Sequence, residues 1–153
     1  MNQPNRIIVP NSVLLGEVTR LLSEGRPVVI PTKGSSMLPF IRGERDSVAL
    51  IKKADIEVGD IVLALIDGSR YVLHRVHGIS GEDVVLMGDG NLVGTENCRK
   101  SDICGTATEI IKESGRKIDV SSNGFRRKSA LWLKLLPVRR YLLFIIRRIN
   151  KLI

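Results

Sequence analysis

The sequence predicts a small, mainly β domain whose strands pair antiparallel, with one helix before it and a basic helical tail after it. Several short apolar runs lie between residues 26 and 120, and turn residues separate them. Apolar residues at helical spacing precede these runs, and a stretch of mixed apolar and basic residues follows them. Short strands with frequent turns favour antiparallel pairing, because a hairpin needs only a tight connection.

The N-terminal segment, residues 1–25, is expected to contain an irregular arm over residues 1–10 and then a helix. Asn11 is a suitable N-cap residue, and Gly25 is a natural helix stop. Between them, apolar residues recur at helical spacing, at Val13, Leu14, Val18, Leu21 and Leu22. No long apolar core follows a positive region here, so no signal peptide is predicted.

Residues 26–120 are predicted to form the β domain. The run RPVVIPT is interpreted as a short strand that leads into a serine-containing loop. Further strands are expected at residues 47–52, 60–66 and 71–79, in the run VVLMGDGN and in the run GTATEIIKE. The sequences DGSR and SGED between these runs have the composition of turns.

Composition and charge indicate the number of domains and the kind of partner. The chain has 153 residues, of which 43% are hydrophobic and 4% aromatic, which indicates one domain with an aliphatic core. The formal net charge is +8, but residues 126–153 contain nine Lys and Arg and no Asp or Glu. The rest of the chain is therefore nearly neutral, which is not the pattern of a uniformly basic nucleic-acid-binding domain.

The two cysteines, Cys98 and Cys104, do not define a disulfide framework or a zinc site. They are interpreted as free thiols in a reducing compartment, with a local disulfide as the alternative. No metal or cofactor is expected. No stretch approaches the roughly 20 apolar residues that a membrane-spanning helix needs.

The stretch TKGSSMLPFIRGERD, residues 32–46, is predicted to be a loop because glycine and proline interrupt regular structure. Loops held by a rigid sheet often carry reactive side chains, although a serine-rich turn is the more ordinary interpretation. A serine hydroxyl becomes a useful nucleophile only when a base accepts its proton. The candidate bases are His74, His77 and the lysines. The two histidines are three residues apart, so in an extended strand only one of them can face a site shared with the serines.

Asp89 follows an apolar run in LMGDGN, where a carboxylate at a strand end could hold an imidazole in one tautomer. Taken singly, each of these signals is weak. Their order along the chain is more specific.

The segments GSSMLPFIRGERD, VGDIVLALIDGSRYVLHRV and LMGDGN together resemble the type I signal peptidases and the related LexA-like self-cleaving peptidases. The resemblance covers roughly residues 26–111 and implies a partly open, antiparallel β fold. It also implies that Ser36, directly before Met-x-Pro, is the nucleophile, which removes Ser35 from that role. His74 matches the base position, as in the endoplasmic-reticulum and archaeal type, and Asp89 matches the acidic position of the Gly-Asp-Asn motif.

The resemblance also implies supporting roles and leaves one position open. Met37 and Pro39 would shape the loop, and the N–H of Ser36, helped by Ser35 or Gly34, would stabilise the oxyanion. Histidine-type members often have another aspartate about six residues beyond the Gly-Asp motif. Here Glu96 is the nearest acid, so Asp89 is predicted as the third catalytic residue with Glu96 as the alternative.

Residues 121–153 are predicted to form a basic amphipathic tail. Pro137 either divides this tail or marks the start of a second helix. Val138, Leu142, Ile145, Ile149 and Leu152 fall on one helical side, and Arg140, Arg147 and Lys151 cluster on another. This pattern is typical of a helix on an anionic membrane surface. Docking onto the domain or a partner is the first alternative, and nonspecific nucleic-acid binding is the second. No base-reading element is found, so no specific nucleic-acid partner is expected.

The resulting hypothesis is a serine endopeptidase that uses Ser36 and His74 to cleave a leader or precursor peptide. Such an enzyme would be cytoplasmic and held on the inner membrane face by its tail. The rival hypotheses are a non-catalytic peptide-binding or assembly module that keeps the fold, and a LexA-like regulator that cleaves itself. The latter lacks a helix-turn-helix before residue 26 and has histidine where that branch uses lysine.

Overall fold

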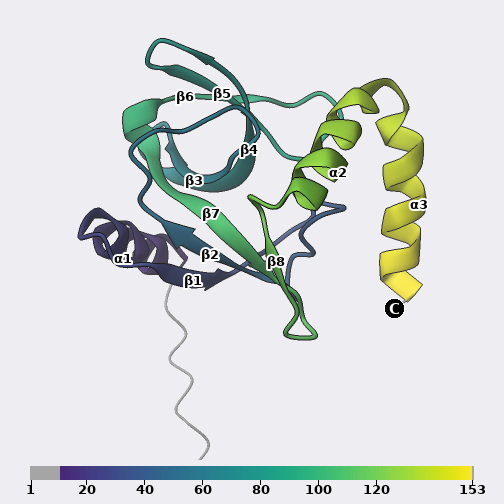
Figure 1. Cartoon of the computed structure of the whole chain (residues 1–153), viewed down its shortest axis with the longest axis horizontal. Coiled ribbons are helices and arrows are strands. Elements are labelled where there is room, and N and C mark those ends of the chain that lie inside the picture. Colours follow the sequence, from purple (N-terminus) through teal and green to yellow (C-terminus); the bar gives the residue numbers. More distant parts are fainter. Residues whose placement is uncertain (1–10, 153) are drawn as a thin grey trace, which may run out of the picture.

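The computed structural model describes residues 11–152, in which the strands form one curved antiparallel sheet (Figure 1). The strand order is β1-β2-β7-β3-β4-β5-β6, and β8 pairs with β7 off this path. The strands are β1 Val28–Pro31, β2 Ser47–Ile51, β3 Ile61–Ile66, β4 Arg70–Ser80, β5 Asp83–Met87, β6 Glu96–Arg99, β7 Ile103–Ile111 and β8 Lys117–Asp119. The predicted fold class, a mainly antiparallel β domain with helices at both ends, is confirmed.

Irregular pairing bends the sheet. β7 pairs with β2 on one side and with β3 and then β8 on the other. The register shifts between Ala49 and Leu50, between Leu63 and Ala64, and between Val76 and Gly78. Such bulges increase the local bend and twist of a strand pair. β1 pairs only with β2, so β1 is an edge strand of the sheet.

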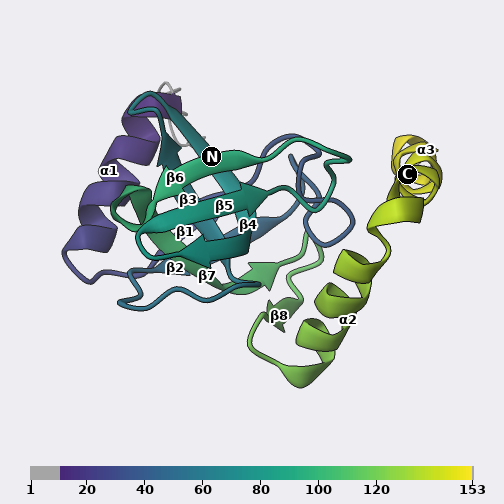
Figure 2. The ribbon, with the colours of Figure 1, turned by 90° about the horizontal axis from the view of Figure 1, so that it is seen from above.

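Three helices and two 3-10 turns complete the described chain. They are α1 Asn11–Ser23, η1 Lys100–Asp102, α2 Asn123–Lys134, η2 Leu136–Val138 and α3 Arg139–Leu152. The helix predicted after residue 10 begins at Asn11 and is followed by Gly25 at φ +80°, a conformation that glycine adopts without strain. Figures 1 and 2 show α1 at one end of the molecule and α3 at the other.

Apolar side chains form three clusters. The largest joins α1 to β1, β2, β3 and β7, and it includes Met37 and Ile41 from the serine loop. The second lies between β3, β4, β5 and the start of β7. The third packs Leu38 of the serine loop against Trp132 of α2 and Leu143 of α3. The serine loop is therefore anchored in the core on one side and under the C-terminal helices on the other.

The sequence patterns missed two strands but placed the division of the tail correctly at Pro137. β6 reads ENCR, which lacks apolar alternation, and β8 has only three residues, KID. The tail forms two helices, and Pro137 lies in the 3-10 turn between them. The arm predicted at residues 1–10 lies outside the described residues. Within residues 11–152, no helix is both long and apolar enough to cross a membrane.

Candidate functional site

The serine loop joins β1 to β2 and is closed by contacts at its base. The N–H and hydroxyl of Thr32 both donate to the carbonyl of Asp46, at 3.0 and 2.8 Å. The buried Asp46 carboxylate accepts from the N–H of Arg42 and from the ammonium of Lys112. These hydrogen bonds hold the pKa of Asp46 below its usual range despite its burial, which by itself would raise it. The loop is thus fixed to the sheet at both ends.

The LMGDGN segment, which comprises the last two residues of β5 and the loop that follows and which we call the LMGDGN loop, contacts the serine loop. The N–H of Gly90 donates to the carbonyl of Ser36 at 2.8 Å. A Cβ on Gly88 would lie 2.3 Å from the Ser36 carbonyl, and a Cβ on Gly90 would lie 2.3 Å from the Ser35 carbonyl. Only glycine permits so close an approach of two backbones. The two glycines that flank Asp89 therefore allow this loop to contact the serines directly.

His74 lies in the middle of β4 opposite Val62 of β3, and its side chain is buried, with 6% exposure. Burial lowers the pKa of His74, an effect that Glu96 and Asp89 partly oppose. Burial therefore favours the neutral imidazole, which is the form that a general base needs. Its Nδ1 has no hydrogen-bond partner among residues 11–152.

Ser36 and His74 line the same cavity, which has a volume of about 240 Å³. His77 does not line it, in keeping with the expectation that one histidine at most faces the serine loop. The other walls come from α1, β1, the serine loop, β3 and β4: Leu14, Leu15, Ile30, Pro31, Thr32, Lys33, Gly34, Met37, Ile41, Gly43, Leu63, Tyr71, Val72 and Leu73. The cavity is thus mainly apolar, with a hydroxyl and an imidazole in its wall.

Asp89 contacts a different residue from the one predicted. Its two carboxylate oxygens accept from Nε and Nη2 of Arg75, each at 2.7 Å, and both side chains are almost fully buried. No hydrogen bond joins Asp89 to His74 in the described part of the chain. This is the bidentate form of an arginine–carboxylate pair, in which each oxygen accepts one N–H. In this structure, then, Asp89 orients Arg75 rather than the predicted base.

Glu96, at the start of β6, is the acidic group that acts most strongly on His74. Its charge raises the pKa of His74 more than that of Asp89 does. The carboxylate pairs with Arg70 of β4 at 2.9 Å, and this pairing lowers the pKa of Glu96. An ionised Glu96 near the imidazole would stabilise the positive charge that a histidine base acquires.

The N–H groups of Ser35 and Ser36 make no hydrogen bond within residues 11–152, whereas the N–H of Gly34 donates to Glu44 at 3.3 Å. Gly34 has φ +72°. Two adjacent N–H groups beside a nucleophile can stabilise an oxyanion. Of the three predicted donors, Ser35 and Ser36 are thus the available pair.

Met37 and Pro39, predicted to shape the loop, hold different parts of it. Met37 is 5% exposed and belongs to the largest core cluster. Pro39 follows a cis peptide bond after Leu38, and Leu38 packs under the C-terminal helices. Directly before these anchors, the loop presents Ser35 to solvent and leaves Ser36 half-buried.

The C-terminal helices bind three successive carbonyls of the LMGDGN loop. The indole of Trp132 donates to the carbonyl of Asp89 at 2.8 Å. Arg147 donates to Gly90 at 2.9 Å, and the buried Arg139 donates to Asn91 at 3.2 Å while stacking on Trp132. A continuous chain of contacts therefore runs from α2 and α3 through this loop to Ser36.

Arg75, Trp132 and Arg139 were not predicted as site residues. Arg75 had one signal in the sequence, which is its position inside an apolar strand. An arginine that is buried in such a strand requires a buried partner. The other two belong to a tail whose residues showed only a charge and amphipathic pattern. Their role depends on contacts across more than 40 residues of sequence, which local patterns do not reveal.

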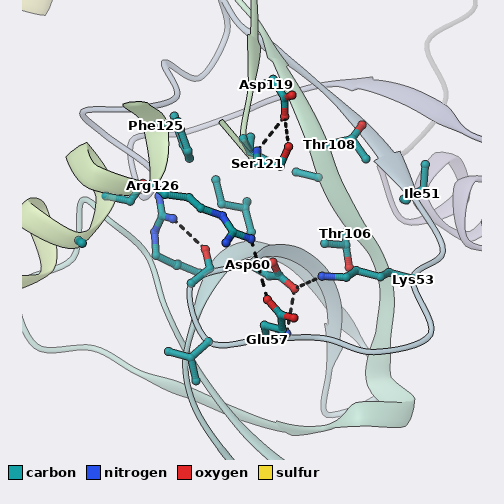
Figure 3. Close-up of a pocket in the computed structure, with 18 of the residues that line it drawn as sticks. Ile51, Lys53, Glu57, Asp60, Thr106, Thr108, Asp119, Ser121, Phe125 and Arg126 are labelled. Atoms are coloured by element: carbon teal, nitrogen blue, oxygen red, sulfur yellow. Dashed lines mark hydrogen bonds and ion pairs between the residues drawn. The ribbon is translucent and has the colours of Figure 1, made fainter. Parts of the chain in front are cut away.

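A larger cavity, of about 440 Å³, lies between α2 and the sheet and does not include Ser36 or His74 (Figure 3). Its charged groups are used internally: Lys53 pairs with Asp60 at 3.0 Å, and Asp60 also accepts from the N–H of Glu57. Among residues 11–152, no group of three or more His, Cys, Asp or Glu could hold a metal ion. Cys98 and Cys104 are free thiols, and burial raises the pKa of Cys98 to about 11.

No protein-family model matches the sequence, and no curated protein matches it significantly. The resemblance to signal peptidases and LexA-like peptidases therefore stays a prediction from the three sequence motifs.

Proposed function

We propose that this chain is a serine endopeptidase of the signal-peptidase-like superfamily, with Ser36 as nucleophile and His74 as general base. The observation that carries the proposal is the shared cavity. Ser36 comes from the loop after β1 and His74 from the middle of β4, and both line the same space. A serine, a buried neutral imidazole and a pair of free N–H groups are the parts that acyl transfer requires.

The proposed reaction follows from these groups. The Ser36 hydroxyl attacks the peptide carbonyl while His74 accepts its proton, and the Ser35 and Ser36 N–H groups stabilise the oxyanion. His74 then gives the proton to the leaving amine, and water attacks the acyl-enzyme with His74 again as the base. Glu96 would stabilise the imidazolium that forms in each half of the reaction.

The substrate is proposed to be an extended segment of a precursor protein. β1 is an edge strand whose outer side is unpaired within residues 11–152, and it leads directly into the serine loop. An extended peptide can add to such an edge through main-chain hydrogen bonds. Ile30 and Pro31 of β1 also line the cavity, so a peptide on this edge would place one side chain inside it. The mainly apolar wall favours an apolar side chain at that position.

The first test compares the wild-type chain with Ser36→Ala and His74→Ala on a mixed peptide library, with products identified by mass spectrometry. We expect both variants to lose cleavage by about a thousandfold or more, because neither partner of such a pair acts alone. Ser35→Ala keeps the backbone N–H and should lose far less. His77→Ala is the matched histidine control.

The rival function is a peptide-binding module without catalysis. One observation favours it: no hydrogen bond joins Ser36 to His74 in the described residues, and Nδ1 of His74 has no partner. On this alternative, wild type and both variants would bind library peptides equally and release no products. Cleavage by wild type that survives unchanged in Ser36→Ala would reject Ser36 as the nucleophile of that cleavage.

A further inference from the structure

Helix α3 has a wide apolar surface, and only the part that we call its inner face packs on the domain. On the inner face, Leu143 is 1% exposed and packs with Leu38 and Trp132, while Leu142 and Ile146 are partly buried beside them. The outer side chains are between 50% and 82% exposed: Tyr141, Phe144, Ile145, Ile149 and Leu152. We call these five residues the outer face of α3. A soluble domain seldom leaves so many large apolar side chains together in water.

The orientation of α3 is defined by polar contacts as well as by packing. Arg139, at the first turn, is fully buried and donates to the carbonyl of Asn91. Arg147, two turns later, donates to the carbonyl of Gly90. These contacts fix the side of the helix that faces the domain. The exposed side chains of the outer face lie on the rest of the helix surface. The helix itself lies at the end of the molecule opposite α1 (Figure 2).

Positive charge lies along one edge of the outer face. At 100° per residue, Arg140, Arg148 and Lys151 lie next to Phe144 on the helix surface. No carboxylate pairs with any Lys or Arg of α3 within residues 11–152, and residues 126–153 contain no Asp or Glu. The partner of this face must therefore accept both apolar side chains and unpaired cations.

Three partners can be compared for the outer face: a second copy of the chain, a nucleic acid and an anionic bilayer. A second copy docked through the same face would bring two cationic surfaces together without an acidic group between them. A nucleic acid would satisfy the cations but leave the apolar side chains in water. An anionic bilayer surface satisfies both, since headgroups bind the cations and the acyl region takes the apolar side chains.

We propose that the outer face of α3 binds the surface of an anionic membrane, with the helix lying in the plane of the interface. The inner face keeps its contacts with the loop that supports Ser36, so the bound protein retains its candidate site. The proposal does not depend on peptidase activity, because binding to lipid can be measured without a substrate.

The test is co-sedimentation of the full chain with vesicles of phosphatidylcholine alone and of phosphatidylcholine with phosphatidylglycerol. We expect binding to the mixed vesicles and much weaker binding to the neutral ones. Ile145→Ser combined with Ile149→Ser should weaken binding about tenfold or more, because two buried side chains are lost. Arg148→Gln combined with Lys151→Gln should do the same, with most of the loss on anionic vesicles.

Val13→Ser is the matched control, because Val13 is 60% exposed on α1, at the opposite end of the molecule. It should bind as the wild type does. Circular dichroism and thermal unfolding establish that each variant is folded. If the Ile145 and Ile149 double variant fails to fold, Phe144→Ser and Leu152→Ser replace it, since these side chains are 66% and 82% exposed.

Three results would overturn the proposal. One is equal binding of the wild type and the folded apolar variant to anionic vesicles, which would mean that charge alone is sufficient. Another is a dimer in analytical ultracentrifugation that the apolar substitutions dissociate, without vesicle binding by the wild type. The third is tighter binding to a DNA or RNA duplex than to vesicles, insensitive to the apolar substitutions.

Discussion

At the scale of single residues, the buried ion pair of Arg75 and Asp89 is the feature that most constrains the site. Arg75 follows His74 in β4, and Asp89 lies in the loop that supports Ser36, so the pair joins the two segments that carry the proposed catalytic residues. The guanidinium also lies against the rings of Phe40 and Phe125, at 5.3 and 5.7 Å. Removal of one charge would leave the other buried without a partner, which is costly.

Asp89 and Glu96 can be separated by their effects on stability and rate. Asp89→Asn should reduce the free energy of unfolding by about 3–5 kcal/mol, because it leaves Arg75 charged and buried. Glu96→Gln breaks only a partly exposed pair with Arg70, worth at most about 1 kcal/mol. It should instead lower kcat if Glu96 stabilises the imidazolium of His74. Urea unfolding measures the free energy of unfolding, and the cleavage assay measures kcat.

A different effect of Asp89→Asn would support the prediction from the motif, in which Asp89 is the third catalytic residue. If Asp89→Asn unfolds at the wild-type urea concentration yet has no activity, Asp89 is the third catalytic residue. In that case Asp89 must leave Arg75 and bind His74 during the reaction.

At the scale of elements, the LMGDGN loop connects the serine loop to the C-terminal helices. On one side, Gly88 and Gly90 contact the backbone of the two serines with no room for a Cβ. On the other side, α2 and α3 donate to the carbonyls of Asp89, Gly90 and Asn91. The serine loop is thus positioned by the packing of the tail as well as by the sheet.

Gly90→Ala should move the serine loop. The new Cβ would lie 2.3 Å from the Ser35 carbonyl, a backbone atom that can shift only if the loop shifts. We expect a loss of cleavage well beyond the loss of stability, measured as kcat/KM beside the thermal midpoint. Gly94→Ala is the matched control, because a Cβ there meets nothing within 4 Å. Equal kcat/KM for the two variants would mean that the position of Ser36 does not depend on this contact.

At the scale of the whole molecule, folding buries His74 and partly buries His77. Burial is the main cause of the lowered pKa of His74 and of His77, and Arg139 lowers the pKa of His77 further. Each imidazole has one ring nitrogen without a hydrogen-bond partner among the described residues, Nδ1 of His74 and Nε2 of His77. The folded state therefore disfavours protonation of both side chains.

Stability should consequently fall as the pH drops below about 6.5, the pKa of an unperturbed histidine. The unfolded chain binds protons at that pH, whereas the folded chain binds them only at a lower pH, so acid favours unfolding in this window. A second decrease, below about pH 4, is expected from Asp46, whose pKa is lowered in the folded state. Thermal midpoints measured from pH 8 to pH 3 give both steps.

The double variant His74→Gln, His77→Gln separates the two contributions. In this variant the thermal midpoint should no longer fall as the pH drops through the histidine range, but it should still fall in the acidic range where Asp46 is protonated. A wild-type midpoint that stays constant between pH 7 and pH 5 would show that neither histidine changes its proton affinity on folding.

The sequence by itself determined the features that depend on local patterns. Apolar periodicity and turn residues predicted α1, most of the strands and the antiparallel fold class, because side-chain spacing reflects burial within a few residues. The same patterns identified the serine loop and placed His74 on a strand. The missed strands, β6 and β8, are short and lack a period, and they form only because β5 and β7 offer them a partner.

Tertiary structure alone decided the partners of charged and aromatic side chains. The motif suggested His74 for Asp89, but the chain path brings the Arg75 guanidinium to both of its oxygens. Amphipathic spacing grouped Leu142 with Ile145 and Ile149. In the structure, Leu142 is partly buried against the domain, whereas Ile145 and Ile149 are exposed. Periodicity tells which side of a helix is apolar. Which part of that side meets the domain depends on contacts between residues far apart in sequence, and these arise only when the whole chain has folded.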